Sequence, residues 1–219
     1  MRASMAAGCR HGRSTSRDQF GDPRGLLGWA ALTAMALKNG GQNKAALALL
    51  DLKPSESVLE LGCGPGMGLR RALRDVGREG FVAGTDQSGC AAHFAAHAVH
   101  RAIMRGNAAV MCAPVADLPF RDLMFDKAFA VNSFQFWPDP SRALREIARV
   151  LAPSGRLVIA QRASREDKPT DFAGASLGLE RIAQVNTLLR AQGWRLLDER
   201  FVEDGARLMV ASVLAEKPA

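Results

Sequence analysis

The 219-residue chain contains no tyrosine, and phenylalanine and tryptophan together make up only 6% of it. Without tyrosine, no phenol side chain can act as a catalytic base. Long apolar runs are absent as well, because the longest, from Trp29 to Leu37, is far shorter than the roughly 20 residues that cross a bilayer. We therefore expect no membrane-spanning helix and no membrane partner.

Cysteine is scarce and scattered, since Cys9, Cys63, Cys90 and Cys112 form no C-x-x-C pair and no compact cluster. Such spacing predicts neither a disulfide framework nor a zinc site. It suits a reducing compartment, so we expect a cytoplasmic protein that holds no metal.

Acidic residues are missing from the first 17 positions, where arginine and serine are frequent. The net charge of the chain is +7, of which +4 falls within residues 1–40, so the remainder is nearly balanced. The segment has no apolar h-region and is not a secretion signal. Its composition fits an organelle transit peptide or a solvated leader. We assign residues 1–20 to a flexible basic leader. A solvated arm is the favoured interpretation of its charge, and binding to a polyanion such as nucleic acid is the less favoured one.

From residue 55 onward, short β-branched or apolar runs alternate with segments of helical periodicity. This rhythm predicts an α/β fold with a mostly parallel sheet and helices on both of its faces. Two more apolar runs flank the turn Glu203-Asp204-Gly205 and predict an antiparallel hairpin. The predicted strands are 57–61, 81–85, 108–112, 127–131, 156–161, 194–201 and 207–214, and the predicted helices are 69–76, 90–105, 142–151 and 177–191.

Two helical patterns, 25–37 and 43–50, precede the first strand and are joined by Asn39-Gly40-Gly41, whose glycines tolerate the positive φ of a helix end. This helical pair either packs on an edge of the sheet or closes over the strand ends as a lid. We divide the chain into the leader, an N-terminal helical lid at 21–53 and an α/β domain at 54–219.

The most informative local pattern is Val58-Leu59-Glu60-Leu61-Gly62-Cys63-Gly64-Pro65-Gly66, an apolar strand followed by glycines at alternate positions. Ligands of open α/β sheets bind beyond the carboxyl ends of the strands, where glycine lets the backbone turn sharply and approach a ligand closely. Glu60, at the end of this strand, can accept hydrogen bonds or face a cationic group of that ligand.

A second acid, Asp86, ends the predicted strand 81–85, and Ser88 is a candidate N-cap for the next helix. A carboxylate at this place can accept hydrogen bonds from both hydroxyls of a ribose, so we expect the ligand to contain a nucleoside. The ligand is not expected to be a dinucleotide, because the third glycine of the G-x-G-x-x-G fingerprint would fall at Met67 or Leu69.

The pattern E-x-G-x-G-x-G at residues 60–66 resembles the first motif of the class I S-adenosylmethionine-dependent methyltransferases. Residues 116–120, 125–126 and 149–155 are similar to further motifs of this family, so the resemblance covers about residues 55–160. It implies a Rossmann-like, seven-stranded, mostly parallel sheet with an antiparallel C-terminal hairpin. It also implies S-adenosylmethionine as the cofactor and methyl transfer to a substrate nucleophile aligned with it.

The resemblance also implies roles for single residues. The three glycines would line the methionine portion of the cofactor, Glu60 would reach its amino group, and Asp86 would hold its ribose. The residues implied in cofactor binding are Glu60, Gly62, Cys63, Gly64, Gly66, Asp86, Gln87, Val115, Ala116 and Asn132. Two positions depart from the family pattern, since Pro114 replaces an aspartate that pairs with adenine and Ser154 replaces a turn glycine.

The segment Asn132-Ser133-Phe134-Gln135-Phe136-Trp137-Pro138 follows the fourth strand and lacks the N/D-P-P-Y/F motif of relatives that methylate nucleic-acid amino groups. This disfavours a nucleic-acid substrate and leaves a small, aromatic or apolar metabolite, with Trp29, Phe136 and Trp137 as candidate contacts. A place in the core is an equally favoured alternative for Phe136 and Trp137 and a slightly more favoured one for Trp29.

Two alternatives stay open, an RNA or protein methyltransferase that uses the basic arm, and a non-catalytic protein that binds the cofactor. His93, His97 and His100 share one helix face without an acidic or cysteine partner, which favours a solvated or packed face over a metal site. The sequence identifies no general base, and it leaves open whether the chain forms a homodimer.

Overall fold

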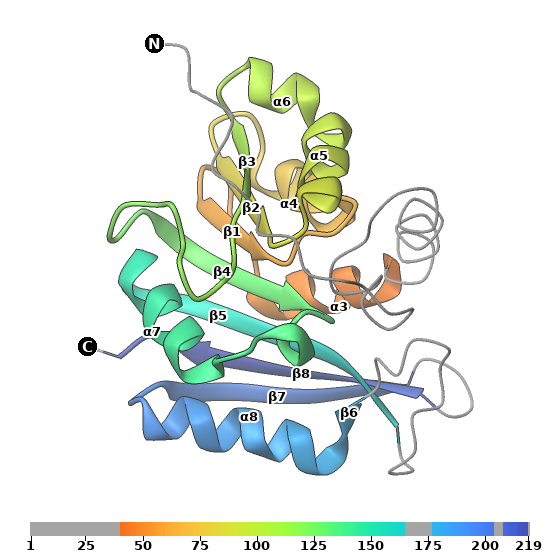
Figure 1. The fold of residues 1–219 in the computed structure, drawn as a ribbon, viewed down its shortest axis with the longest axis vertical. Helices are drawn as coiled ribbons and strands as arrows, with labels where there is room; N and C mark the ends of the chain where they lie inside the picture. Colours follow the sequence, from red (N-terminus) through yellow and green to blue (C-terminus); the bar gives the residue numbers. More distant parts are fainter. Residues whose placement is uncertain (1–39, 165–176, 204–207, 219) are drawn as a thin grey trace.

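The computed structural model describes residues 40–164, 177–203 and 208–218. The predicted leader, the predicted helix 25–37, the candidate substrate residue Trp29 and part of the predicted hairpin turn lie outside these residues. Within the described residues, one mixed sheet forms the centre of an α/β fold (Figure 1).

The strands follow the order β3-β2-β1-β4-β5-β8-β7 in the sheet. Strands β1 to β5 are parallel, and β8 is antiparallel to both of its neighbours, β5 and β7. The predicted mostly parallel sheet with an antiparallel C-terminal hairpin is therefore confirmed. The strands are β1 Ser57–Leu61, β2 Phe81–Asp86, β3 Ala108–Cys112, β4 Phe125–Val131, β5 Leu151–Ser164, β7 Arg195–Glu203 and β8 Leu208–Glu216.

An eighth strand, β6 (Leu177–Gly178), pairs with the end of β5 and was not predicted, because two residues carry no readable periodicity. The turn that the family pattern implies around Ser154 lies inside β5 as an irregularity. There the register with β4 passes from Phe125↔Leu151 to Lys127↔Arg156. Ser154 has φ +60° at this point, a conformation that favours glycine.

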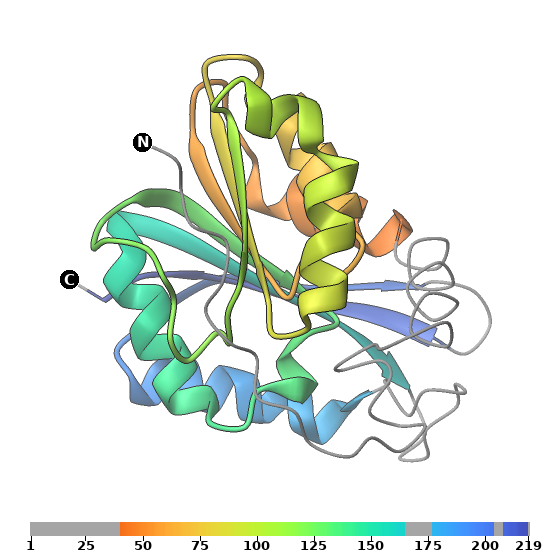
Figure 2. The ribbon, with the colours of Figure 1, turned by 45° about the horizontal axis from the view of Figure 1, so that its top comes forward.

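Helices cover both faces of the sheet (Figure 2), as the sequence predicts. One face carries α3, α4, α5 and α6, and the other carries α7 and α8. The helices are α3 Gly40–Leu50, α4 Met67–Val76, α5 Gly89–Ala98, α6 His100–Met104, α7 Pro140–Val150 and α8 Leu179–Ala191, with a short 3₁₀ turn, η1, at Phe134–Phe136. The single helix predicted over 90–105 is two helices, because Val99 has φ −115° and interrupts the α-helical path.

Helix α3 belongs to the main hydrophobic core of its face. Its side chains Ala46 and Leu50 are fully buried against residues of the sheet such as Val58 and Val158. The glycines Gly40 and Gly41 lie in the first turn of α3, which therefore begins three residues before the predicted helix 43–50. The end of the predicted helix 25–37 lies outside the described residues.

The sheet has a topological switch point between β1 and β4, since the chain extends from β1 through β2 to β3 on one side and from β4 to β5 on the other. Open α/β sheets leave a crevice outside the carboxyl ends of the strands at such a point. The fold therefore places a ligand site where Glu60 and Asn132 end their strands.

Candidate active site

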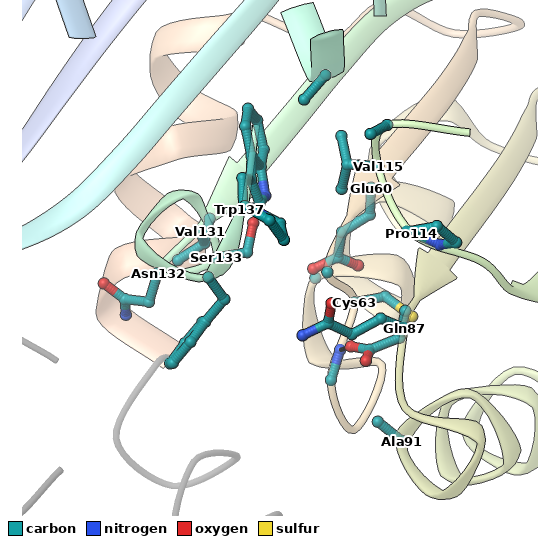
Figure 3. A pocket seen from close by; sticks show the side chains of 18 of the residues that line it. Glu60, Cys63, Gln87, Ala91, Pro114, Val115, Val131, Asn132, Ser133 and Trp137 are labelled. Atoms are coloured by element: carbon teal, nitrogen blue, oxygen red, sulfur yellow. Dashed lines mark hydrogen bonds between the residues drawn. The ribbon is translucent and has the colours of Figure 1, made fainter. Parts of the chain in front are cut away.

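A cavity of about 270 Å³ lies at the carboxyl ends of β1, β2 and β4 (Figure 3). Glu60, Cys63 and Gln87 face it from one side, and Val131 and Trp137 face it from the other (Figure 3). The residues singled out from the sequence that line this cavity are Glu60, Gly62, Cys63, Gly64, Asp86, Gln87, Val115, Ala116, Asn132, Phe136 and Trp137. Residues far apart in the sequence thus meet at one site.

The glycine loop after β1 is shaped by left-handed backbone conformations at Gly62 (φ +73°) and Gly64 (φ +48°). The N–H groups of Gly62 and Cys63 both donate to the Thr85 carbonyl, at 2.8 and 2.9 Å, and so hold the loop against β2. A Cβ at Gly62 would lie 2.5 Å from the Cβ of Ser133. Both the backbone and the packing therefore require glycine at this position.

Gly66 is not among the residues that line the cavity. It precedes the first residue of α4 with φ +82°, and a Cβ there would lie 2.9 Å from the Cα of Ala95 on α5. The close packing of α4 against α5 therefore explains why residue 66 is a glycine.

The Asp86 carboxylate connects the glycine loop to the turn after β2. One of its oxygens accepts a hydrogen bond from Gly64 N–H at 2.8 Å, and the other accepts from Ser88 N–H at 2.9 Å. Ser88 caps α5 by accepting from Ala91 N–H at 3.3 Å, which confirms the predicted N-cap. These bonds fix the orientation of the carboxylate at the edge of the cavity.

Glu60 is buried, with 3% of its surface exposed, and its Oε2 has no hydrogen-bond partner in the protein. Burial raises the pKa of this carboxyl well above its usual range, the backbone N–H of Leu69 opposes the rise, and the nearby Asp86 adds to it. Gly68 in the first turn of α4 makes room for the carboxyl, because any Cβ there would overlap its oxygens. Gly68 continues the alternation of glycines at 62, 64 and 66, and this alternation was the signal in the sequence that could have identified it.

Asn43, on α3, lines the same cavity and was not singled out from the sequence. It is 6% exposed, and its Oδ1 is buried without a hydrogen-bond partner. Two buried oxygen acceptors, one on Glu60 and one on Asn43, are thus left for a ligand that donates hydrogen bonds, as an ammonium group does. No sequence motif marked Asn43, because α3 meets the strand ends only in the tertiary structure.

Asn132 lines the cavity with φ +53°, and its side chain is held by two other elements. Its Oδ1 accepts a hydrogen bond from the backbone N–H of Arg162 on β5 at 2.9 Å, and its Nδ2 contacts the amide of Gln42 on α3. The backbone turn after β4 is therefore fixed by α3 and β5.

Five residues of the opposite wall are Val131, Ser133, Phe136, Trp137 and Pro138, and Asp139 and Arg142 line the cavity as well. Trp137 is 8% exposed and also packs against Phe134 at a ring-centroid distance of 5.1 Å, so it serves both the wall and the core. The Ser133 hydroxyl donates to the Leu61 carbonyl at 2.7 Å. This wall is mainly apolar, and none of these five residues titrates near neutral pH.

The connection between β3 and β4 brings Pro114, Val115 and Ala116 to the cavity. Arg149 on α7 holds this connection, because its guanidinium donates to the carbonyls of Leu118 and Phe120 at 2.9 and 2.8 Å. The same guanidinium pairs with the carboxylates of Glu146 (2.8 Å) and Asp122 (2.7 Å).

Within the described residues, no group of three His, Cys, Asp or Glu side chains is arranged as a metal site. Among the helices of the same residues, none has the length and apolar character of a membrane span.

Residues 59–159 match a protein family described as the methyltransferase domain. The strand order, the glycine loop after β1 and the acid after β2 agree with this match, so the chain is similar to the class I S-adenosylmethionine-dependent methyltransferases over this part of its length. The methyltransferase domain implies S-adenosylmethionine as the cofactor.

Among curated relatives, the uncharacterized methyltransferase YdaC of Bacillus subtilis is 26% identical over 84% of this chain and 96% of its own length. The O-methyltransferase resE of Aspergillus sclerotiorum is 29% identical over 73% of this chain and 62% of its own length. The 2-phytyl-1,4-naphtoquinone methyltransferase of a Nostoc species is 35% identical over 49% of this chain and 47% of its own length. This chain therefore spans only about half to two thirds of the latter two relatives.

A solved structure of a SAM-dependent methyltransferase from Aquifex aeolicus has the same fold, with a TM-score of 0.71 and 22% identity. The similarity covers 85% of this chain and 97% of that chain. The sheet with its antiparallel hairpin is therefore the fold of a known methyltransferase.

Proposed function

We propose that the protein transfers a methyl group from S-adenosylmethionine to a small, aromatic or otherwise apolar metabolite. The observation that carries this proposal is the apolar wall of Val131, Phe136, Trp137 and Pro138, which faces the glycine loop across a cavity of about 270 Å³. A flat or hydrocarbon-rich molecule gains from burial against such a wall.

The buried polar groups of the cavity fit the cofactor. Glu60 and Asn43 offer oxygen acceptors without protein partners, which suit the α-ammonium group of the methionine portion. Asp86, fixed by the N–H groups of Gly64 and Ser88, is oriented to accept hydrogen bonds from the ribose hydroxyls. Gln87, Val115 and Ala116 would contact the adenine, with Pro114 adding an apolar surface in place of the aspartate of other family members.

When bound, S-adenosylmethionine supplies an electrophilic methyl group on a sulfonium sulfur. The chain contributes mainly position, because an in-line displacement needs the reacting atoms within about 3–3.5 Å and aligned. The glycine loop would hold the cofactor on its side of the cavity, and the aromatic wall would orient the acceptor.

Two relatives, an O-methyltransferase and a 2-phytyl-1,4-naphtoquinone methyltransferase, have names that agree with a small acceptor. We extend this class to the present chain. Trp29 stays a predicted substrate contact and the cytoplasmic location stays a prediction, while the question of a homodimer stays open.

Calorimetry with S-adenosylhomocysteine and, separately, NADH tests the cofactor first, and only the former is expected to bind. Incubation with S-adenosylmethionine and a panel of phenols, hydroquinones and naphthoquinols, followed by mass spectrometry, then tests the acceptor. A product heavier by one methyl group supports the proposal. Methylation of RNA or protein in place of every small acceptor, with affinity lost steeply as salt is added, would favour the alternative substrate class.

A further inference from the structure

A second depression, of about 580 Å³, lies between α4 and the pair α5–α6 and shares no lining residue with the active-site cavity. Four arginines and two histidines line this basic groove, and its floor is apolar. The lining residues used below are Arg70 and Arg74 on α4, His97 and His100 on α5 and α6, and Arg101 and Arg105 at α6. Figure 1 shows the three helices side by side at one end of the molecule.

The arrangement of positive charge follows from helix periodicity. Arg70 and Arg74 are four residues apart and therefore lie on one face of α4, and Arg101 and Arg105 have the same spacing. All four side chains are exposed, and within the described part of the chain none of them forms an ion pair or a side-chain hydrogen bond. Four guanidinium groups thus meet in one groove with their donors free.

Acidic side chains do not neutralise this groove. Residues 87–107 contain no aspartate or glutamate, and the acid of α4, Asp75, lies roughly 140° around the helix from Arg70. Mutual repulsion makes such a cluster unfavourable by itself, whereas a bound anion would relieve it.

The guanidinium fork matches the oxygens of phosphate, to which it donates two parallel hydrogen bonds. The described lining residues include no phenylalanine or tryptophan, the large aromatic side chains on which the bases of a single strand commonly stack. The groove is hollow, with Leu73, Val99 and Ala102 at its floor, a shape that suits a compact ligand better than a flat lipid surface.

We propose that the basic groove between α4 and α5–α6 binds the triphosphate group of a small anion, either a nucleoside triphosphate or free tripolyphosphate. The proposal is independent of the methyl acceptor, because the two sites share no residue. It is also distinct from polyanion binding by the N-terminal arm, since every group it uses lies between Arg70 and Arg105.

The test compares a double variant, Arg70→Gln with Arg101→Gln, with a matched double variant, Arg145→Gln with Arg190→Gln, which removes two exposed arginines from α7 and α8. Calorimetry with sodium tripolyphosphate and with ATP, at low and at physiological salt, gives the affinities. We expect the groove variant to lose about tenfold or more in affinity for tripolyphosphate and the matched variant to change less than about twofold. Binding of S-adenosylhomocysteine should be unchanged in both variants, which shows that both are folded.

The two probes separate the sources of the phosphate. Equal affinities would mean that the phosphates alone are recognised, and tighter binding of ATP would mean that the apolar floor also holds the nucleoside. Equal losses in both double variants, or no measurable binding to the unmodified protein, would overturn the proposal. So would tighter binding of a short RNA duplex or of phosphatidylserine vesicles that is lost in the groove variant, because the groove would then serve a macromolecular surface.

Discussion

At the scale of single residues, Asp86 is the side chain on which nucleoside recognition depends. Asp86→Ala should weaken binding of S-adenosylhomocysteine by about 1.5–3 kcal/mol, the range for hydrogen bonds to a charged group. The same change removes the acceptor of Gly64 N–H and Ser88 N–H, so part of the loss would come from a less ordered glycine loop. Calorimetry measures the affinity, and circular dichroism checks the fold. Unchanged affinity in a folded variant would contradict the ribose assignment.

Glu60 gives a prediction in which stability and binding change in opposite directions. Burial raises the pKa of this carboxyl in the folded protein, so between the unfolded and folded pKa values the folded state holds more protons. The free energy of unfolding therefore falls as pH rises through that window. Glu60→Gln cannot lose this proton, so without cofactor it should resist denaturant better than the unmodified protein at pH 8. The advantage should shrink toward pH 4.

The same substitution should weaken cofactor binding by about 1.5–3 kcal/mol, because the charged acceptor for the ammonium group is lost. Binding to the unmodified protein should release a proton, since a cation beside Glu60 favours its ionised form. Calorimetry in two buffers of different ionisation enthalpy measures that release. A release that persists undiminished in Glu60→Gln would assign the proton to another group.

At the scale of elements, α7 positions the β3–β4 connection through Arg149. Arg149→Gln would leave the carbonyls of Leu118 and Phe120 without their donors, at a cost of about 1–3 kcal/mol in the free energy of unfolding. Because this connection carries Val115 and Ala116 to the cavity, cofactor affinity should fall as well. Chemical denaturation and calorimetry measure the two effects. Arg145→Gln, on the same helix but exposed, is the control and should change neither quantity appreciably.

Helix α3 illustrates how one element can serve both the core and the site. Its apolar residues, Ala46 and Leu50 among them, are buried against the sheet, while Gln42 and Asn43 at its start reach Asn132 and the cavity. The sequence presented this helix as part of a separate lid, because its apolar spacing does not reveal which surface it covers. The lid assignment of residues 21–53 stays a prediction for the part that precedes α3.

At the scale of the whole molecule, cofactor binding should stabilise the fold by mass action. S-adenosylhomocysteine at about 100 times its Kd should add about 2.7 kcal/mol, which raises Tm by about 5–10 °C for a protein of this size. NADH at the same concentration should leave Tm unchanged. Thermal unfolding followed by circular dichroism measures both shifts in Tm. A similar rise with NADH would mean that the site does not distinguish S-adenosylhomocysteine from NADH.

The sequence alone determined the order of strands and helices along the chain and the position of the glycine loop, because both follow from patterns of neighbouring residues. The apolar runs predicted the first and last residues of β1 and β3 correctly. The alternate glycines after Glu60 marked the strand end at which a ligand is expected. A two-residue strand such as β6 and the interruption of the predicted helix at Val99 carry too little local signal to be predicted.

Only the tertiary structure decided which distant residues meet. It brought Asn43 to the cavity and placed Gly66 against Ala95 outside the cavity wall. It also joined Arg70 and Arg101 in the basic groove. These outcomes depend on how helices pack across the sheet, and packing is set by burial and shape summed over many residues, which no short motif records.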